Sequence, residues 1–223
     1  MPALRALLPR LVAIAALAVG FQILTVAVSL GWLSGADHDV EQVMASLWDP
    51  PLHPVIQAIA AFGGVELTTL VMVGLVVYLW RRGFPADAFV FVAFLVAELF
   101  EILYKSNLTH PAPPVSVSRA DGPSISTFLD QAGGGHNSFP SGHMVRTVLV
   151  YGLLAFVLRR LAPWPWLRNL AVPLAIVLIV AMAFTRLYLE VHWESDVLGG
   201  LLLGAIALVS ATVWLDRPQR VDN

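Results

Sequence analysis

Three short segments of the chain carry residues that could bind an anion and move a proton. They are "YKSNLTHPAP", "FPSGHMV" and "TRLYLEVHWESD". Their candidate residues are Lys105, Ser141, Gly142, His143, Arg186, His192 and Asp196. Imidazole nitrogens can act as nucleophile or proton carrier, and Lys and Arg side chains bind anionic oxygens. This set of residue types favours chemistry on an anionic group.

The "PSGH" stretch from Pro140 to His143 stands directly before a long apolar run, where a helix is expected to begin. The first N–H groups of a helix have no internal partner, and the helix dipole makes this end an anion site. Ser141 adds a hydroxyl, Gly142 lets a ligand approach the backbone, and His143 can carry a proton. The stretch therefore predicts one wall of an anion pocket.

His192 and Asp196 are four residues apart. On a helix this spacing puts both side chains on one face. A carboxylate bound to one ring nitrogen fixes the tautomer and leaves the other nitrogen to attack. The pair predicts a histidine nucleophile with Asp196 as its orienting group.

The composition indicates an all-α, polytopic membrane protein. Of the 223 residues 58% are hydrophobic and only 13% are charged, with a mean hydropathy of +0.77, whereas soluble domains carry about 25% charge. Stretches of about 20 apolar residues match the bilayer core. No cysteine is present, which excludes disulfides and thiolate metal sites. We expect one membrane domain, 1–223, of six spans: 11–33, 55–80, 84–105, 142–160, 169–189 and 197–215.

The charges of the connections predict one topology. Nine arginines fall on one side: Arg5, Arg10, Arg81, Arg82, Arg159, Arg160, Arg168, Arg217 and Arg220. By the positive-inside rule that side, with both termini, is cytoplasmic. The three polar segments then meet on the opposite, non-cytoplasmic face. The long Pro- and Gly-rich segment 106–140 lies there and is expected to be an active-site loop. Gly200 and Gly204 form a small-residue face for helix packing.

These motifs resemble the three signatures of the type 2 phosphatidic acid phosphatase family. The family pattern is Lys-x6-Arg-Pro, then Pro-Ser-Gly-His, then Ser-Arg-x5-His-x3-Asp. The second motif is complete here, and the third matches from Arg186 to Asp196 with Thr185 in place of Ser. The resemblance implies a metal-independent reaction in which His192 forms a phosphohistidine. It also implies that His143 moves the proton, and that Lys105, Arg186, Ser141 and Gly142 bind the phosphate.

The first motif departs from the family pattern, because the position expected to be Arg is Ala112. The loss of a bidentate guanidinium is not easily replaced. His110, Arg119 and Arg146 are possible substitutes, and we favour Arg146, which shares a helix face with His143. A charge at that depth requires a partner or a wet cavity. Glu101, four residues before Lys105, is positioned to pair with it, either to orient it or only to satisfy a buried charge.

The expected function is hydrolysis of a lipid phosphate or diphosphate in the plasma membrane of a bacterium. Phosphatidic acid, phosphatidylglycerol phosphate and polyprenyl diphosphate all fit the site. Two alternatives stay open: transfer of the phosphoryl group to an acceptor, and a lipid-phosphate binder or transporter that has lost catalysis. No cofactor, metal or nucleic acid is expected, and the sequence does not predict the oligomeric state.

Overall fold

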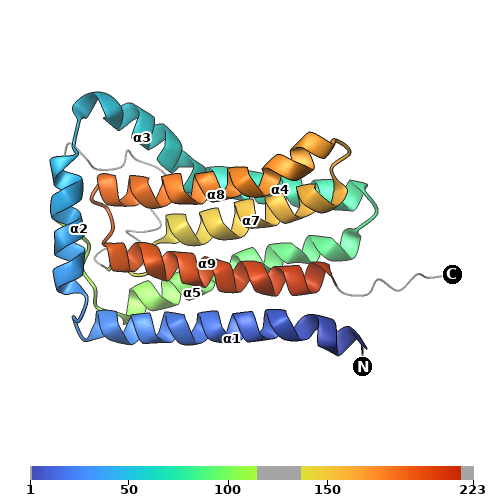
Figure 1. Cartoon of the computed structure of the whole chain (residues 1–223), viewed down its shortest axis with the longest axis horizontal. Coiled ribbons are helices and arrows are strands. Elements are labelled where there is room, and N and C mark those ends of the chain that lie inside the picture. The colour runs from blue at the N-terminus through green and yellow to red at the C-terminus, as the bar shows by residue number, and fades with distance from the viewer. Residues whose placement is uncertain (1, 115–136, 217–223) are drawn as a thin grey trace.

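The computed structural model describes residues 2–114 and 137–216. Its long helices run side by side in one bundle (Figure 1). They are α1 (Pro2–Ser29), α4 (Val65–Arg81), α5 (Val90–Asn107), α7 (Gly142–Leu161), α8 (Pro165–Tyr188) and α9 (Glu194–Leu215). In the described ranges the β-structure is limited to one isolated antiparallel bridge, between Pro111 and Asn137.

Helix ends follow the local sequence. Gly31 and Gly83 adopt positive φ angles of 69° and 82° just after α1 and α4, a conformation that glycine adopts without steric cost. Proline stands at the first position of α8, Pro165, where no N–H is needed. In the predicted topology Gly83 and Pro165 stand in the cytoplasmic connections, whereas Gly31 ends the first span on the opposite side.

The segment between the first two predicted spans is more ordered than the sequence indicated. Residues 34–54 were expected to connect spans, but they contain α2 (Ser34–Ser46), which runs across one end of the bundle in Figure 1. Polar residues give α2 low average hydropathy, so composition alone did not reveal it.

The second predicted span, 55–80, is broken. It comprises α3 (His53–Ala60) and the short 3-10 turn Ala61–Gly63, followed by α4. The two parts meet at an angle of 44° beside Gly64, whose extended backbone ends the first part. The break places Gly63 O where it accepts a hydrogen bond from Arg146.

Helix α7 forms the centre of the bundle. Its first ten residues, 142–151, are all buried, and it packs against α8 on one side and α9 on the other. Helix α1 packs on the outer side of α9. The central helix is therefore the one that begins with the Pro-Ser-Gly-His motif.

Within residues 2–114 and 137–216, three helices are long and apolar enough to span a membrane: Leu7–Ser29, Pro165–Tyr188 and Glu194–Leu215. A fourth span results if the bent pair Pro50–Gly63 and Val65–Arg81 crosses as one unit. Helix α5 is not among them, and it carries Glu98, Glu101 and Lys105. The chain is thus a helical membrane protein, and its expected count of six spans remains a prediction.

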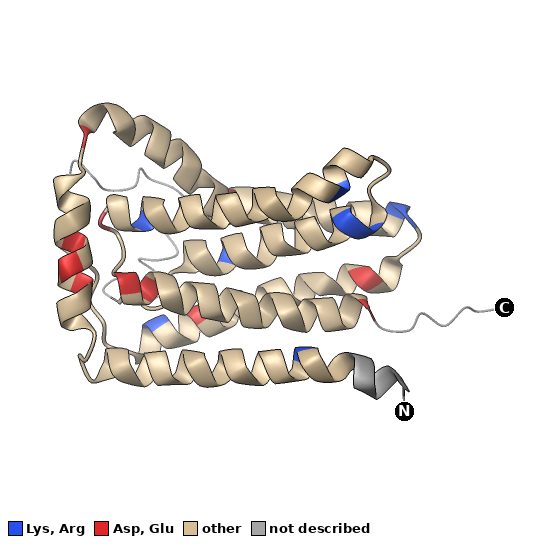
Figure 2. Cartoon of the chain, viewed as in Figure 1, with Lys and Arg blue, Asp and Glu red and all other residues tan. Residues whose placement is uncertain are grey.

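Basic side chains gather at the end of the bundle opposite α2 (Figure 2). Arg10 forms an ion pair with Asp216, which joins the beginning of α1 to the end of α9. Arg82 and Arg160 donate hydrogen bonds to Leu161 O and Leu215 O at the carboxyl ends of α7 and α9. Cations at helix carboxyl ends complement the helix dipole.

Candidate active site

The predicted nucleophile and its orienting acid lie in contact. His192 Nδ1 is 3.3 Å from Asp196 Oδ2, and both residues are buried. The same oxygen accepts the Trp193 N–H at 2.9 Å, which caps the first turn of α9. Asp196 is therefore both a helix cap and the partner of His192. With Nδ1 engaged, Nε2 is the ring nitrogen left for chemistry.

The structure brings the three motifs together around His143. His143 is buried at the start of α7, close enough to Arg186, Arg146, His192 and Lys105 for their charges to act on it. These residues come from α5, α7, the end of α8 and the turn before α9. Four cationic or protonatable side chains around one imidazole make this cluster suited to bind an anion.

Close contacts between α9 and the beginning of α7 fix the positions of the second and third motifs relative to each other. A Cβ on Gly200 would lie 2.4 Å from Ser141 O, so α9 can approach the first turn of α7 only with glycine here. Ser141 N also donates to Asp196 O at 3.0 Å. A Cβ on Gly204 would lie 2.9 Å from Val145 O, which confirms the packing role expected for this pair of glycines.

Glycine at position 142 leaves room for a side chain of α5. A Cβ there would lie 2.0 Å from Glu101 Oε1, the oxygen that binds Lys105 Nζ at 2.9 Å. Gly142 thus lets a carboxylate of α5 approach the amino end of α7. The predicted pair between Glu101 and Lys105 is present, and both side chains are buried.

Arg146 belongs to the same charge network. Its Nη1 lies 3.2 Å from Glu98 Oε2 and 3.2 Å from Glu101 Oε2, and its Nε donates to Gly63 O at 3.0 Å. Glu101 is consequently shared between Arg146 and Lys105. Arg146 is one turn inside the bundle from His143, at the depth that the sequence indicated.

Ser141, at the amino end of α7, has a buried hydroxyl that a ligand could bind. Ser141 is fully buried, and its Oγ makes no hydrogen bond within the described residues. Leaving a buried hydroxyl unsatisfied costs about 1–3 kcal/mol. An anion at the amino end of α7 would satisfy it.

The sequence analysis named His110 only as a possible substitute for the missing arginine, and it did not predict the contacts that hold the site from outside. His110 Nε2 lies 3.3 Å from Asp196 Oδ1, and Asn137 binds both His110 N and Lys105 O through its amide. Asp37 of α2 accepts Ser195 N and Oγ, each at 2.9 Å. These residues stand in polar segments without periodicity, and no spacing pattern linked them to the motifs. Arg119, another suggested substitute for the missing arginine, lies outside the described residues.

The fold and this cluster describe a helical membrane protein with a buried His–Asp pair beside buried cationic side chains. The family model described as "PAP2 superfamily" matches residues 86–220, and the chain belongs to this family. The resemblance drawn from the three motifs is therefore confirmed.

Two relatives support the assignment, and one solved structure supports the fold. The Escherichia coli (strain K12) protein named "Putative undecaprenyl-diphosphatase YbjG" is 32% identical over 168 residues, which is 74% of this chain and 76% of that protein. "Phosphatidylglycerophosphatase B" of Bacillus subtilis (strain 168) is 25% identical over 83% of this chain and 86% of that protein.

The solved structure is that of the PAP2 type phosphatidylglycerolphosphate phosphatase from Bacillus subtilis. It matches with a TM-score of 0.74 at 23% identity, over 93% of this chain and 98% of that chain. This match supports the fold.

Proposed function

We propose that this protein is an integral membrane phosphatase that hydrolyses a lipid phosphate or diphosphate through a phosphohistidine on His192. The observation that carries the proposal is the buried His192–Asp196 contact at 3.3 Å, set beside His143 and the cationic side chains around it. The names of the curated relatives, an undecaprenyl diphosphatase and a phosphatidylglycerophosphatase, support a lipid phosphate as substrate.

In the first step His192 Nε2 attacks phosphorus. An N–P bond forms while the bond to the leaving oxygen breaks, and His143 gives that oxygen a proton. Asp196 keeps the ring in the required tautomer and stabilises the positive charge that develops on it. Lys105, Arg186, the Ser141 hydroxyl and the Gly142 N–H hold the phosphoryl oxygens, where negative charge must be stabilised.

In the second step water hydrolyses the phosphohistidine. His143, now neutral, takes a proton from water as the new P–O bond forms and the N–P bond breaks. Inorganic phosphate leaves, and both histidines return to their starting states. In this scheme side chains supply the positive charge on the phosphoryl oxygens, and we propose that the reaction requires no metal ion.

The proposed location is the plasma membrane of a bacterium, with the pocket on the non-cytoplasmic face. The support is the gathering of basic residues at the end of the bundle opposite α2, together with the positive-inside rule. The lipid tail would remain in the bilayer while the head group enters between α5, α7 and α9.

The proposal predicts that purified protein in detergent micelles releases phosphate in excess EDTA. The substrates to compare are phosphatidic acid, phosphatidylglycerol phosphate and a polyprenyl diphosphate, with His192→Ala as the blank. Full activity in EDTA from at least one lipid is the expected result. Folded protein that releases no phosphate from any of the three would contradict hydrolysis and favour transfer or binding.

We further propose that Arg146 serves the phosphate site, and that its contact with Glu101 helps to position Lys105. Arg146→Ala should lower kcat/KM for phosphate release by about 100-fold, because it leaves Glu98 and Glu101 without a buried cationic partner. Arg159→Ala, at the exposed opposite end of α7, is the matched control and should retain activity. Steady-state kinetics on both variants checks the prediction, and an unchanged kcat/KM for Arg146→Ala would exclude this role.

A further inference from the structure

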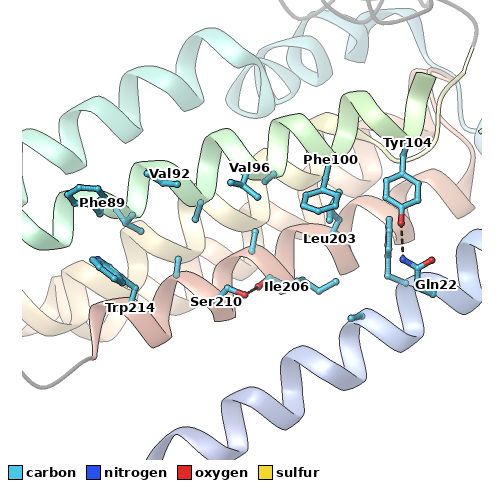
Figure 3. A pocket seen from close by; sticks show the side chains of 17 residues that line it. Gln22, Phe89, Val92, Val96, Phe100, Tyr104, Leu203, Ile206, Ser210 and Trp214 are labelled. Atoms are coloured by element: carbon cyan, nitrogen blue, oxygen red, sulfur yellow. Dashed lines mark hydrogen bonds between the residues drawn. The ribbon is translucent and has the colours of Figure 1, made fainter. Parts of the chain in front are cut away.

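An apolar groove of about 660 Å³ runs along the outside of the bundle between α1, α5 and α9. Figure 3 shows its two long walls, with Val92, Val96 and Phe100 on α5 and Leu203, Ile206 and Ser210 on α9. Its remaining lining includes small side chains, Ala18, Ala93, Ala97, Ala207 and Ala211. Large exposed apolar side chains border it, among them Phe89 and Val92. A groove with this lining, open to the bilayer, suits a slender hydrocarbon chain.

One end of the groove adjoins the active site. There Gln22 donates a hydrogen bond to Tyr104 Oη at 2.8 Å, the only polar pair that Figure 3 draws between two of the groove's helices. Tyr104 directly precedes Lys105, and its ring packs edge-on against Phe21 at 4.9 Å. Phe139, just before the Pro-Ser-Gly-His motif, stacks on Phe21 at 5.8 Å. This end of the groove therefore lies one residue from Lys105, beside the aromatic cluster of Phe21, Tyr104 and Phe139.

The other end lies on the outside of the bundle, between the beginning of α5 and the carboxyl end of α9. Trp214 donates Nε1–H to Ala86 O at 2.9 Å, and its ring lies 6.1 Å from that of Phe89. Ser210 follows Asp196 by fourteen residues of α9, a distance of about 21 Å along a helix. Half of a bilayer core is about 15 Å thick. A chain that starts at the pocket and reaches Ser210 thus passes the middle of the membrane.

We propose that this groove binds the hydrocarbon tail of the substrate, and that its length selects a single long prenyl chain over a diacyl lipid. The inference rests on the proposed function, since it assumes that a lipid head group occupies the pocket. An acyl chain of one leaflet ends near the bilayer midplane, whereas a long prenyl chain extends beyond it. Only the prenyl chain would contact the half of the groove around Val92 and Ser210.

The test uses a bulky side chain as an obstruction at that depth. Ser210→Trp should lower kcat/KM for undecaprenyl diphosphate about tenfold, while leaving geranyl diphosphate and phosphatidic acid within twofold of wild type. Val180→Trp on α8, exposed and outside the groove, is the matched control and should change none of the three. Val92→Trp, on the opposite wall at similar depth, should repeat the selective loss and guards against a folding defect of the first variant.

The outcomes separate the groove from the chemistry. A decrease in kcat/KM for undecaprenyl diphosphate alone, in either groove variant, supports the proposal. An equal decrease in kcat/KM for all three substrates in both variants, or no decrease for any of them, overturns it. Failure of the proposed function gives a different result, because wild-type protein would then release phosphate from none of the three.

Discussion

His192→Ala is expected to lower phosphate release by at least about 10³-fold and to abolish covalent labelling of the protein. The imidazole supplies the atom that bonds to phosphorus, and alanine cannot replace it. Water in the emptied space would lack the orientation that the Asp196 contact gives to the ring. The measurement is phosphate release together with ³²P incorporation, after alkaline quenching, from a lipid diphosphate labelled on its terminal phosphate.

His143→Ala provides the informative comparison for this prediction. A diphosphate leaves as a phosphate ester, which needs less protonation than an alkoxide, so the first step should proceed in this variant. The second step needs a base to accept the proton from water, and it should become slow. Labelled protein should therefore accumulate in His143→Ala and be absent in His192→Ala. Label in both variants would place the covalent bond on another residue.

The part of the site that was predictable consists of residues whose spacing is set by one helix or one turn. Glu101 and Lys105 share a face of α5, and their expected contact is present. The expected contact of His192 with Asp196 is also present, although His192 lies in the turn before α9 and not on the helix itself. Motif spacing also predicted that α5, α7 and α9 would bring their polar ends together. These contacts could be predicted because side-chain spacing within one helix or turn is fixed, and because segments that cross a membrane must be helical and apolar.

The contacts that could not be predicted are those between segments distant in the chain. The approach of His110 to Asp196 depends on how the segment after α5 folds back, and that of Asp37 to Ser195 depends on where α2 crosses the bundle. Both connections are polar, and neither the 3.6-residue period nor hydropathy specifies their course. The break at Gly64 was missed for a related reason, because apolar residues on both sides of the Gly63–Gly64 pair together have the length of one span.

The charge network of Arg146 was predicted only in part: the sequence indicated that Arg146 needs a partner but not which residues provide it. Its depth in the membrane implied a partner, and the acids of α5 were noted in the sequence, but nothing in the pattern joined the two. A buried charge in a bilayer needs compensation, and here two carboxylates supply it. The same pairing ties Arg146 to Lys105 through Glu101, so one substitution in this group is expected to affect several residues of the site.

Gly200→Ala is the substitution outside the charged residues for which we expect the largest loss. The added Cβ would lie 2.4 Å from Ser141 O and 2.6 Å from Met144 Cβ, and neither is the end of a flexible side chain. The helices must move apart, at a cost of about 1–3 kcal/mol in the free energy of unfolding. Because Ser141 N also binds Asp196 O, the movement shifts the phosphate-binding turn relative to His192. A displacement of about 1 Å between catalytic groups reduces the reaction rate by about 100-fold.

Gly74→Ala is the matched control for Gly200→Ala, since an added Cβ at Gly74 meets nothing within 4 Å. It lies in α4, where alanine favours the helix by about 0.5–1 kcal/mol relative to glycine. Thermal unfolding and kcat, measured side by side, should show a lower midpoint and a lower rate for Gly200→Ala and neither for Gly74→Ala. If Gly200→Ala keeps the wild-type rate, the approach of α9 to Ser141 does not set the geometry of catalysis. If the rate falls while substrate affinity is retained, the glycine contact acts by aligning the phosphate-binding turn with its nucleophile, which makes helix packing itself part of the catalytic apparatus.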